Sequence, residues 1–231
     1  DSAYTNIAAR GPDSVIPDSA ALNVRITSEG TSGPVTLAGE SGASVFTLTQ
    51  MAGVTATVAT AGKTLSAYTV SIGDGAGALM LGENPGDGTL QIGSGVGELA
   101  LVNRSTNALT INAAVAESVV GTALAKGGKG AVSLNGRVSV TGTNRVTEGS
   151  LTLGALAGSS HVIGSAVDMT GGGPTPVMLE VKGSSEVVDY GNFSAGLVAG
   201  DRCVVKLDAD LSVQASPGTV GGRMYVGNGL G

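Results

Sequence analysis

The chain has 231 residues, of which 39 are glycine; 42% of the residues are hydrophobic, 3% are aromatic and 13% are charged. This apolar content and the net charge of -6 exclude a disordered chain, and the glycines follow no collagen period. The 12 lysines and arginines are scattered, so we expect no nucleic-acid partner. No run of 18 apolar residues is present, and no segment is predicted to span a membrane.

Residues 1–40 contain Pro12, Pro17 and Pro34 and few repeated aliphatic residues. We predict that this segment is an N-terminal cap of the fold or an arm that docks on an open strand edge of a neighbouring copy. Residues 41–231 are predicted to form one repetitive body, a fragment of a longer protein.

Later in the chain a short phrase recurs, in which a glycine or asparagine precedes two aliphatic residues at alternate positions. The clear copies are GALMLG at 77–82, GTLQIG at 88–93, GELAL at 97–101, NALTI at 107–111, GAVSLNG at 130–136 and GSLTLG at 149–154. Alternation is typical of strands, in which successive side chains point to opposite faces. The best helical candidate, 109–126, is rich in β-branched residues, which favour strands.

The spacing of these copies predicts how the strands are arranged. Their first aliphatic residues are Leu79, Leu90, Leu99, Leu109, Val132 and Leu151. The steps of 11, 9 and 10 residues are followed by 23 and 19, which we interpret as doubled steps of a ten-residue unit, two or so to a coil. Such a repeat favours a β-solenoid, in which like strands stack on one another, and the scarcity of aromatic residues argues against the alternative, an antiparallel sandwich.

Turn dipeptides mark the expected corners of the coil. They are Asp74-Gly75, Asp87-Gly88, Asn135-Gly136 and Asn228-Gly229. Glycine accepts a positive φ without steric cost, so we place the sharp bends of the backbone at these positions.

Residues 124–154 read LAKGGKGAVSLNGRVSVTGTNRVTEGSLTLG. This stretch resembles the autotransporter-associated β-strand repeat, also called the passenger-associated transport repeat, with the rough pattern L-x-K-x-G-x-G-x-L-x-L-x-G-x-N-x-Y-T-G-x-T-x-V-x-x-G-x-L-x-x-G. The residues at its positions are Leu124, Lys126, Gly128, Gly130, Val132 (for a leucine), Leu134, Gly136, Thr141, Gly142, Val146, Gly149, Leu151 and Gly154. Val138, Val140 and Asn144 depart from its asparagine, tyrosine and threonine.

The resemblance implies an all-β fold, a right-handed parallel β-helix (β-solenoid) with Gly-, Asn- and Asp-rich corners. It also implies a large bacterial protein that is secreted or displayed on the cell surface. We expect such a protein to continue beyond residue 231.

The residues that carry chemistry are few. Asp208 and Asp210 share a strand face and are the one close acidic pair, interpreted as a solvated turn edge rather than as a polysaccharide-cleaving site. His161 is interpreted as an exposed loop residue, with a Ser–His–Asp triad left open, and Cys203 as a small buried residue, with a reactive thiol as the alternative. The segment 61–64 ends like a phosphate-binding loop but lacks its first glycine.

Other short patterns are weaker. The threonine pairs at 47–49 and 55–57 are interpreted as ordinary strand surface, although a regular threonine row would match ice. The segment 73–77 is similar to calcium-binding turns, but its aspartate is not repeated in register. N-glycosylation sequons occur at 103–105 and 192–194. No cofactor or metal site is predicted.

We therefore predict a non-enzymatic structural protein outside the bacterial cell or on its surface. It would be a rigid β-solenoid spacer that pairs with copies of itself, end to end or by edge strands, into a fibre or surface layer. The alternative is a glycan-binding or polysaccharide-cleaving β-helix protein, and the second alternative is an ice- or surface-binding adhesin.

Overall fold

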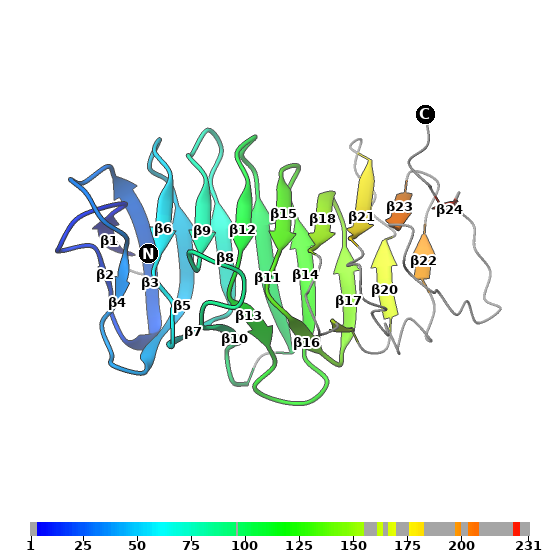
Figure 1. Cartoon of the computed structure of the whole chain (residues 1–231), viewed down its shortest axis with the longest axis horizontal. Coiled ribbons are helices and arrows are strands. Elements are labelled where there is room, and N and C mark those ends of the chain that lie inside the picture. Colours follow the sequence, from blue (N-terminus) through cyan, green and yellow to red (C-terminus); the bar gives the residue numbers. More distant parts are fainter. Residues whose placement is uncertain are drawn as a thin grey trace.

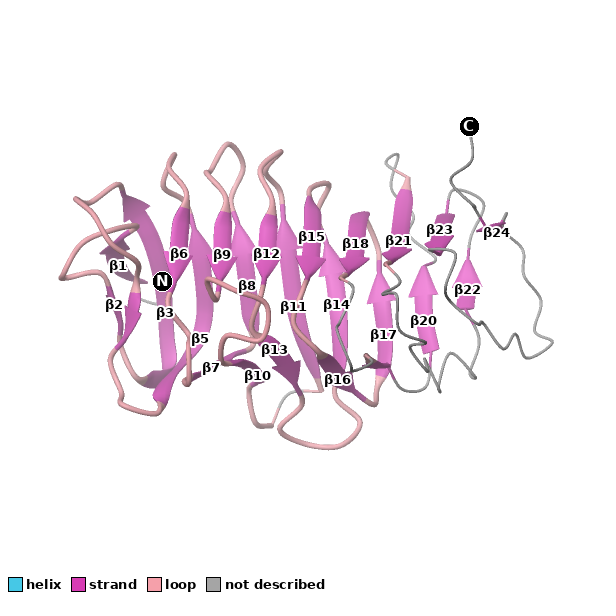
Figure 2. Ribbon diagram, in the orientation of Figure 1, coloured by secondary structure: helices cyan, strands magenta, loops and turns pink. Residues whose placement is uncertain are grey.

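The computed structural model describes residues 4–95, 97–154, 161–163, 166–169, 176–182, 197–199, 203–207 and 224–226. Within these residues the chain is an elongated stack of short strands, coiled from one end to the other (Figure 1). The described part contains strands and loops and no helix (Figure 2). The predicted all-β class is therefore confirmed.

The strands lie on three faces of the coil. The first face holds β7 (Thr64–Ala67), β10 (Thr89–Ile92), β13 (Ala114–Ala116), β16 (Val138–Val140) and β19 (Val162–Ile163). The second face holds β8 (Thr69–Ile72), β11 (Glu98–Asn103), β14 (Ala123–Gly127), β17 (Thr143–Val146), β20 (Ala166–Met169) and β22 (Leu197–Ala199). The third face holds β6 (Ala56–Val58), β9 (Leu79–Leu81), β12 (Leu109–Ile111), β15 (Ala131–Leu134), β18 (Gly149–Leu153), β21 (Val177–Val181), β23 (Cys203–Leu207) and β24 (Met224–Val226).

The N-terminal strands continue the same stack. They are β1 (Tyr4–Ala8), β2 (Val15–Ile16), β3 (Ser19–Ser28), β4 (Thr36–Leu37) and β5 (Gly42–Gln50). β1 pairs with β3, β3 with β5, and β2 with β4, while Val35 bridges to Val58 of the third face. β5 pairs with both β7 and β8, and so joins the first two faces into one 14-stranded sheet. The role of residues 1–40 as cap or docking arm stays a prediction.

Like segments lie over like segments, as the repeat predicts. Every pairing between the described strands is parallel. On the third face, successive partners form one buried ladder, which consists of Leu79, Leu109, Val132, Leu151 and Leu179. The parallel β-solenoid is thus confirmed, and its repeating unit is the whole coil.

The coil contains three strands where the spacing suggested about two. Leu90 and Leu99, which also begin copies of the phrase, lie on the first and second faces and not in the ladder of Leu79 and Leu109. The 23-residue step from Leu109 to Val132 is therefore one complete coil, and it contains three strands rather than the two that the ten-residue unit predicts. Strands of similar sequence occupy different faces because each face needs the same alternation of inward and outward side chains.

The interior is one continuous aliphatic cluster. Its described members are almost all Val, Leu, Ile and Ala, and no aromatic side chain is among them. Removing each Leu or Ile side chain from water contributes on the order of 1.5–3 kcal/mol. Since no single coil encloses enough of them, the coils stabilise one another.

Glycines form several corners, for two different reasons. Gly75 and Gly88 both have a φ of +69°, as expected for the two Asp-Gly dipeptides. Gly136 has an ordinary φ, but a Cβ there would lie 2.2 Å from the carbonyl oxygen of Ala113 in the preceding coil. The predicted corner at Asn228-Gly229 lies outside the described residues.

Candidate functional site

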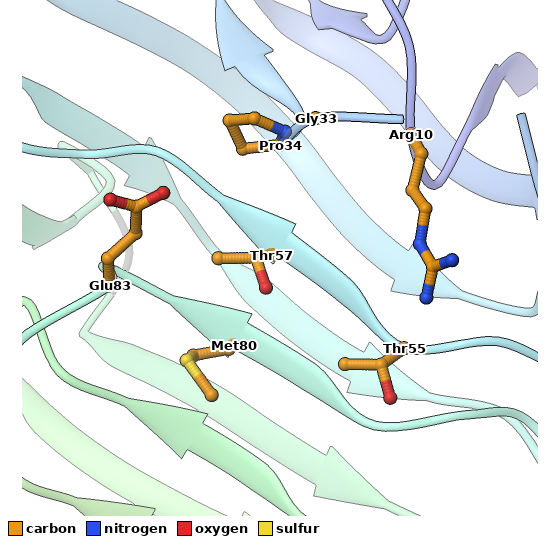
Figure 3. A pocket seen from close by; sticks show the side chains of 7 residues that line it. All are labelled: Arg10, Gly33, Pro34, Thr55, Thr57, Met80 and Glu83. Carbon is orange, nitrogen blue, oxygen red and sulfur yellow. The ribbon is translucent and has the colours of Figure 1, made fainter. Parts of the chain in front are cut away.

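A groove of about 410 Å³ lies on the outer side of the third face near the N-terminal coils (Figure 3). Its floor contains Pro34, Thr57 and Met80, which come from three successive coils. Each of these residues precedes a buried aliphatic residue, which is Val35, Val58 or Leu81. Because side chains alternate along a strand, the three neighbours of the core point outward and meet in one place.

Two opposite charges flank this floor. Arg10 follows β1 and Glu83 follows β9, and Figure 3 shows their side chains on opposite sides of Thr57 and Met80. Both charged residues are exposed, and neither belongs to the ion pairs of the described residues. The two charges are therefore free to meet a ligand.

The polar atoms of the floor are free as well. Thr55 and Thr57 both line the groove, and no described residue hydrogen-bonds their hydroxyl groups. Gly33 completes the lining. The groove thus offers one cation, one anion and two hydroxyl groups, around a small apolar surface of Met80 and Pro34. A single carboxylate with no histidine, cysteine or second acid beside it provides an electrostatic contact rather than acid–base chemistry.

Lys126 of the repeat motif is a buried corner residue. Its side chain is 1% exposed, and Nζ donates to the carbonyl oxygens of Gly127, Gly128 and Glu148 at 3.1, 2.5 and 2.6 Å. Burial lowers its pKa to about 8, and the negative charge of Glu148 opposes that shift. The ammonium group thus binds together the corner between the second and third faces.

The remaining residues of the repeat motif also pack inside the coil or against a neighbouring coil. The apolar members are buried and point inward; they are Leu124, Val132, Leu134, Val146 and Leu151. The glycines lie where a neighbouring coil approaches closely: a Cβ on Gly128 would lie 2.3 Å from Asn103 O, and one on Gly142 2.4 Å from Gly121 O. Thr141 accepts a hydrogen bond from the Gly121 N–H and donates to the carboxylate of Glu117.

The sequon at 103–105 is part of another buried corner. Asn103 is 0% exposed, and its amide donates to the carbonyl oxygens of Asn107 and Ala131 at 2.8 and 2.7 Å. Ser105 donates to Ala76 O at 2.6 Å. A glycan on Asn103 is incompatible with this packing. The second sequon, at 192–194, lies outside the described residues.

The prediction that His161 is an exposed loop residue is wrong. The side chain is 3% exposed, its Nδ1 accepts from the Val138 N–H at 3.2 Å, and its Nε2 lies 2.8 Å from Gly154 O. Burial lowers its pKa; the hydrogen bond to Gly154 raises it, and the charge of Arg137 lowers it further. Just before β19, the imidazole ring therefore bonds to main-chain groups of Val138 and Gly154. A single histidine in a polar stretch of sequence gives no sign of this role.

Three further predictions concern Cys203, the acidic pair Asp208 and Asp210, and the segment 61–64. Cys203 begins β23, and its backbone pairs with Val177. Asp208 and Asp210 lie outside the described residues, so the acidic pair stays a prediction. In the segment that ends like a phosphate-binding loop, Lys63 Nζ donates to Gly39 O at 3.0 Å and is a contact between coils.

The aspartates of the candidate calcium turns are occupied separately. Asp74 forms an ion pair with Lys129 at 3.3 Å, and Asp87 accepts from the Asn84 N–H at 2.7 Å. Among the residues that the structure describes, no group of three or more His, Cys, Asp or Glu residues could hold a metal ion.

The threonine pair 47–49 lies on the outer surface of the second face, whereas the pair 55–57 lines the groove on the third face. Thr47 is paired with Thr69, and Thr49 with Ser71. In the next coil the corresponding residues are Ala100 and Val102, so this hydroxyl row covers two neighbouring strands, β5 and β8. Such a short row leaves the ordinary strand-surface interpretation as the simpler one.

An aromatic pair, the exposed Phe46 and the half-buried Tyr68, lies at the corner between the first and second faces. The rings of Phe46 and Tyr68 have centroids 5.1 Å apart, and Tyr68 OH donates to Ser94 O at 2.8 Å. Tyr68 covers Gly93, where a Cβ would lie 2.5 Å from the ring. Residues 22 apart in sequence give no signal of this pairing until the coil length is known.

The comparisons add nothing to this site. A comparison with protein-family models, with curated proteins and with solved structures found no match. None of the described residues forms a helix long and apolar enough to cross a membrane.

Proposed function

We propose that this chain is a non-enzymatic structural protein, a rigid spacer that lies outside the bacterial cell or on its surface. The observation that supports this proposal is the uninterrupted stacking of parallel strands around one aliphatic core. Each coil is held to the next by main-chain hydrogen bonds on three faces, so bending the rod would open strand pairs on one of them. A stack of this kind supplies length and stiffness without an active site.

The polar corners support the same proposal. Asn135 donates to the side-chain oxygen of Asn112 in the preceding coil at 2.9 Å, and Asn112 donates to Gly82 O at 3.0 Å. Lys126 bonds the carbonyl oxygen of Glu148 in the following coil. Since buried polar groups are costly to leave unpaired, these contacts fix how each coil sits on its neighbour.

Self-association is the second part of the proposal, and the second face suits it. Between β8 and β14 its outward residues Thr69, Ser71, Ala100, Val102 and Ala125 are small and uncharged, whereas Glu98 and Arg145 form an ion pair on the same face. The small, uncharged residues let a second copy approach closely over this part of the face, because little side-chain entropy and little charge desolvation oppose the contact there. We propose that copies associate through such faces, or through open strand edges, into a fibre or layer.

Two measurements test the proposal. Small-angle X-ray scattering of a dilute sample should show the cross-section and length of a rod, and a compact profile would overturn the spacer role. Light scattering over a concentration series should show growing mass. The variant A100K/A125K should reduce that growth, whereas A114K/T89K, which adds the same charge to the first face, should leave it unchanged. A wild-type protein that stays monomeric would contradict self-association.

Glycan binding is the second candidate function, favoured by the exposed Phe46 ring beside the half-buried Tyr68. Aromatic rings on a surface offer flat apolar platforms that sugar rings can cover. The test is a polysaccharide panel with wild type and F46A. Equal retention of both proteins, or retention of neither, would remove this candidate.

A further inference from the structure

We propose that the groove beside Arg10 and Glu83 binds a short, extended peptide with a free amino group and a free carboxylate. The inference is independent of self-association, because it concerns a site within one chain. Arg10 and Glu83 both line this groove, and their oppositely charged side chains lie on either side of Thr57 and Met80 (Figure 3). An ion of either sign alone would meet one attractive and one repulsive group, whereas a ligand that carries both charges satisfies both.

The distance between the charged groups sets the length of the ligand. Thr55 immediately precedes β6, and Figure 3 shows Arg10 on the same side of the floor. Glu83 follows β9 by two residues, near the opposite ends of the strands. A stretch of three to five residues at about 3.3 Å per residue spans roughly 10–17 Å, which is the reach of an extended peptide of three to five residues.

The floor offers what a peptide backbone requires. The hydroxyl groups of Thr55 and Thr57 have no protein partner among the described residues, and each can donate to a carbonyl group or accept from an amide. Farther along the same face, the corresponding hydroxyl of Thr152 is already bonded to Glu180 at 3.3 Å. Met80 and Pro34 provide a small apolar contact for short side chains.

The same lining disfavours a neutral sugar. The residues of the groove are Arg10, Gly33, Pro34, Thr55, Thr57, Met80 and Glu83, and none of them is aromatic. A sugar ring would find no flat platform there, while it would leave both charges without a counter-charge. The Phe46–Tyr68 pair of the second candidate function lies at a different corner of the coil.

The probe is tetra-alanine with free ends, added to ¹⁵N-labelled protein and followed by NMR shift changes. The amides of residues 33, 55–57 and 80–83 should shift together, with saturation in the millimolar range or below. N-acetylated tetra-alanine and C-amidated tetra-alanine should each bind about five- to tenfold more weakly, since each loses one charge-assisted contact. Equal affinities of the free and the doubly blocked peptide would overturn the proposal. An absence of shifts at a peptide concentration of about 10 mM would also overturn it, because a dissociation constant above this value is too weak to matter.

Matched variants identify the two ends. E83Q should abolish the preference for a free amino group, and R10Q should abolish the preference for a free carboxylate. The charge swap R10E/E83R should restore binding, because the peptide can turn round. E40Q, which changes an exposed acid outside the groove, should bind like the wild type. A neutral oligosaccharide that shifts the same residues in both wild type and R10Q/E83Q would overturn the peptide assignment.

Discussion

The ammonium nitrogen of Lys126 lies 2.6 Å from the carbonyl oxygen of Glu148, which is 22 residues later in the chain and one coil farther along the solenoid. The same nitrogen also bonds two carbonyl oxygens of its own turn, so one buried cation satisfies three acceptors. A lysine in a core is normally costly because its charge loses water. Here the cost is offset because the carbonyl groups would themselves be left unpaired without it.

Replacing this lysine by an apolar residue should therefore destabilise the protein. We expect K126M to lower the free energy of unfolding by about 3 kcal/mol, since it leaves buried carbonyl groups without a donor. K129M is the matched control: Lys129 lies in the same turn, is 54% exposed and pairs with the exposed Asp74, so its loss should cost within about 0.5 kcal/mol. Urea denaturation followed by circular dichroism measures both. Equal midpoints for the two variants would contradict this role.

The pKa of Lys126 predicts an unusual alkaline response. It is lowered from 10.5 to about 8 by burial, so between these values the unfolded chain holds more protons on this lysine than the folded protein does. The penalty for burying the charge is fully present below pH 8 and is relieved as the pH rises toward 10.5. The free energy of unfolding of wild type relative to K126M should thus increase by up to about 1.4 kcal/mol per pH unit in this window. A difference that stays constant from pH 7.5 to 10.5 would refute the shift.

The alternation of aliphatic residues was sufficient to predict the strands, because a strand with one buried face must repeat with a period of two, and the recurrence of the phrase favoured their parallel stacking. Leu109 and Thr110 illustrate this: the first is buried in the ladder and the second points outward. The number of strands per coil was not predictable in the same way. Val70 pairs with Leu101 but Lys126 pairs with Val146, so one coil is half as long again as another and the spacing alone is ambiguous.

The candidate groove could not be predicted, because its residues come from separate coils whose register depends on those variable lengths. Thr57 and Met80 become neighbours only because β6 and β9 pair in one register. The environment of His161 was missed for a related reason. Its partners, Val138 and Gly154, are brought to it by the coil and not by the local phrase.

The two Asp-Gly corners provide a test of glycine in which the backbone angle is held constant. Gly75 and Gly88 share a φ of +69°, but a Cβ on Gly75 would meet nothing within 4 Å, whereas one on Gly88 would lie 1.8 Å from Thr60 O. We expect G75A to cost about 1 kcal/mol, from the left-handed conformation alone. G88A should cost more than about 3 kcal/mol, because backbone of the neighbouring coil must also move. Thermal denaturation of both variants measures the difference, and similar losses would show that the corner is less tightly packed than the structure indicates.

The environment of His161 predicts that the later coils weaken in mild acid. Nδ1 accepts the Val138 N–H, so the proton is on Nε2, which donates to Gly154 O; a second proton on Nδ1 would break the first of these bonds. Because burial lowers the pKa of His161 below its ordinary 6.5, the unfolded chain takes up this proton first, and stability is lost as the pH falls below 6.5. Hydrogen exchange should show faster exchange of the Val138 amide at pH 5 than at pH 7, after correction for the intrinsic rate. In H161Q, whose amide does not titrate but can both accept and donate, the corrected rate should not change between these values. An equal pH response in both proteins would assign the effect to surface carboxylates instead.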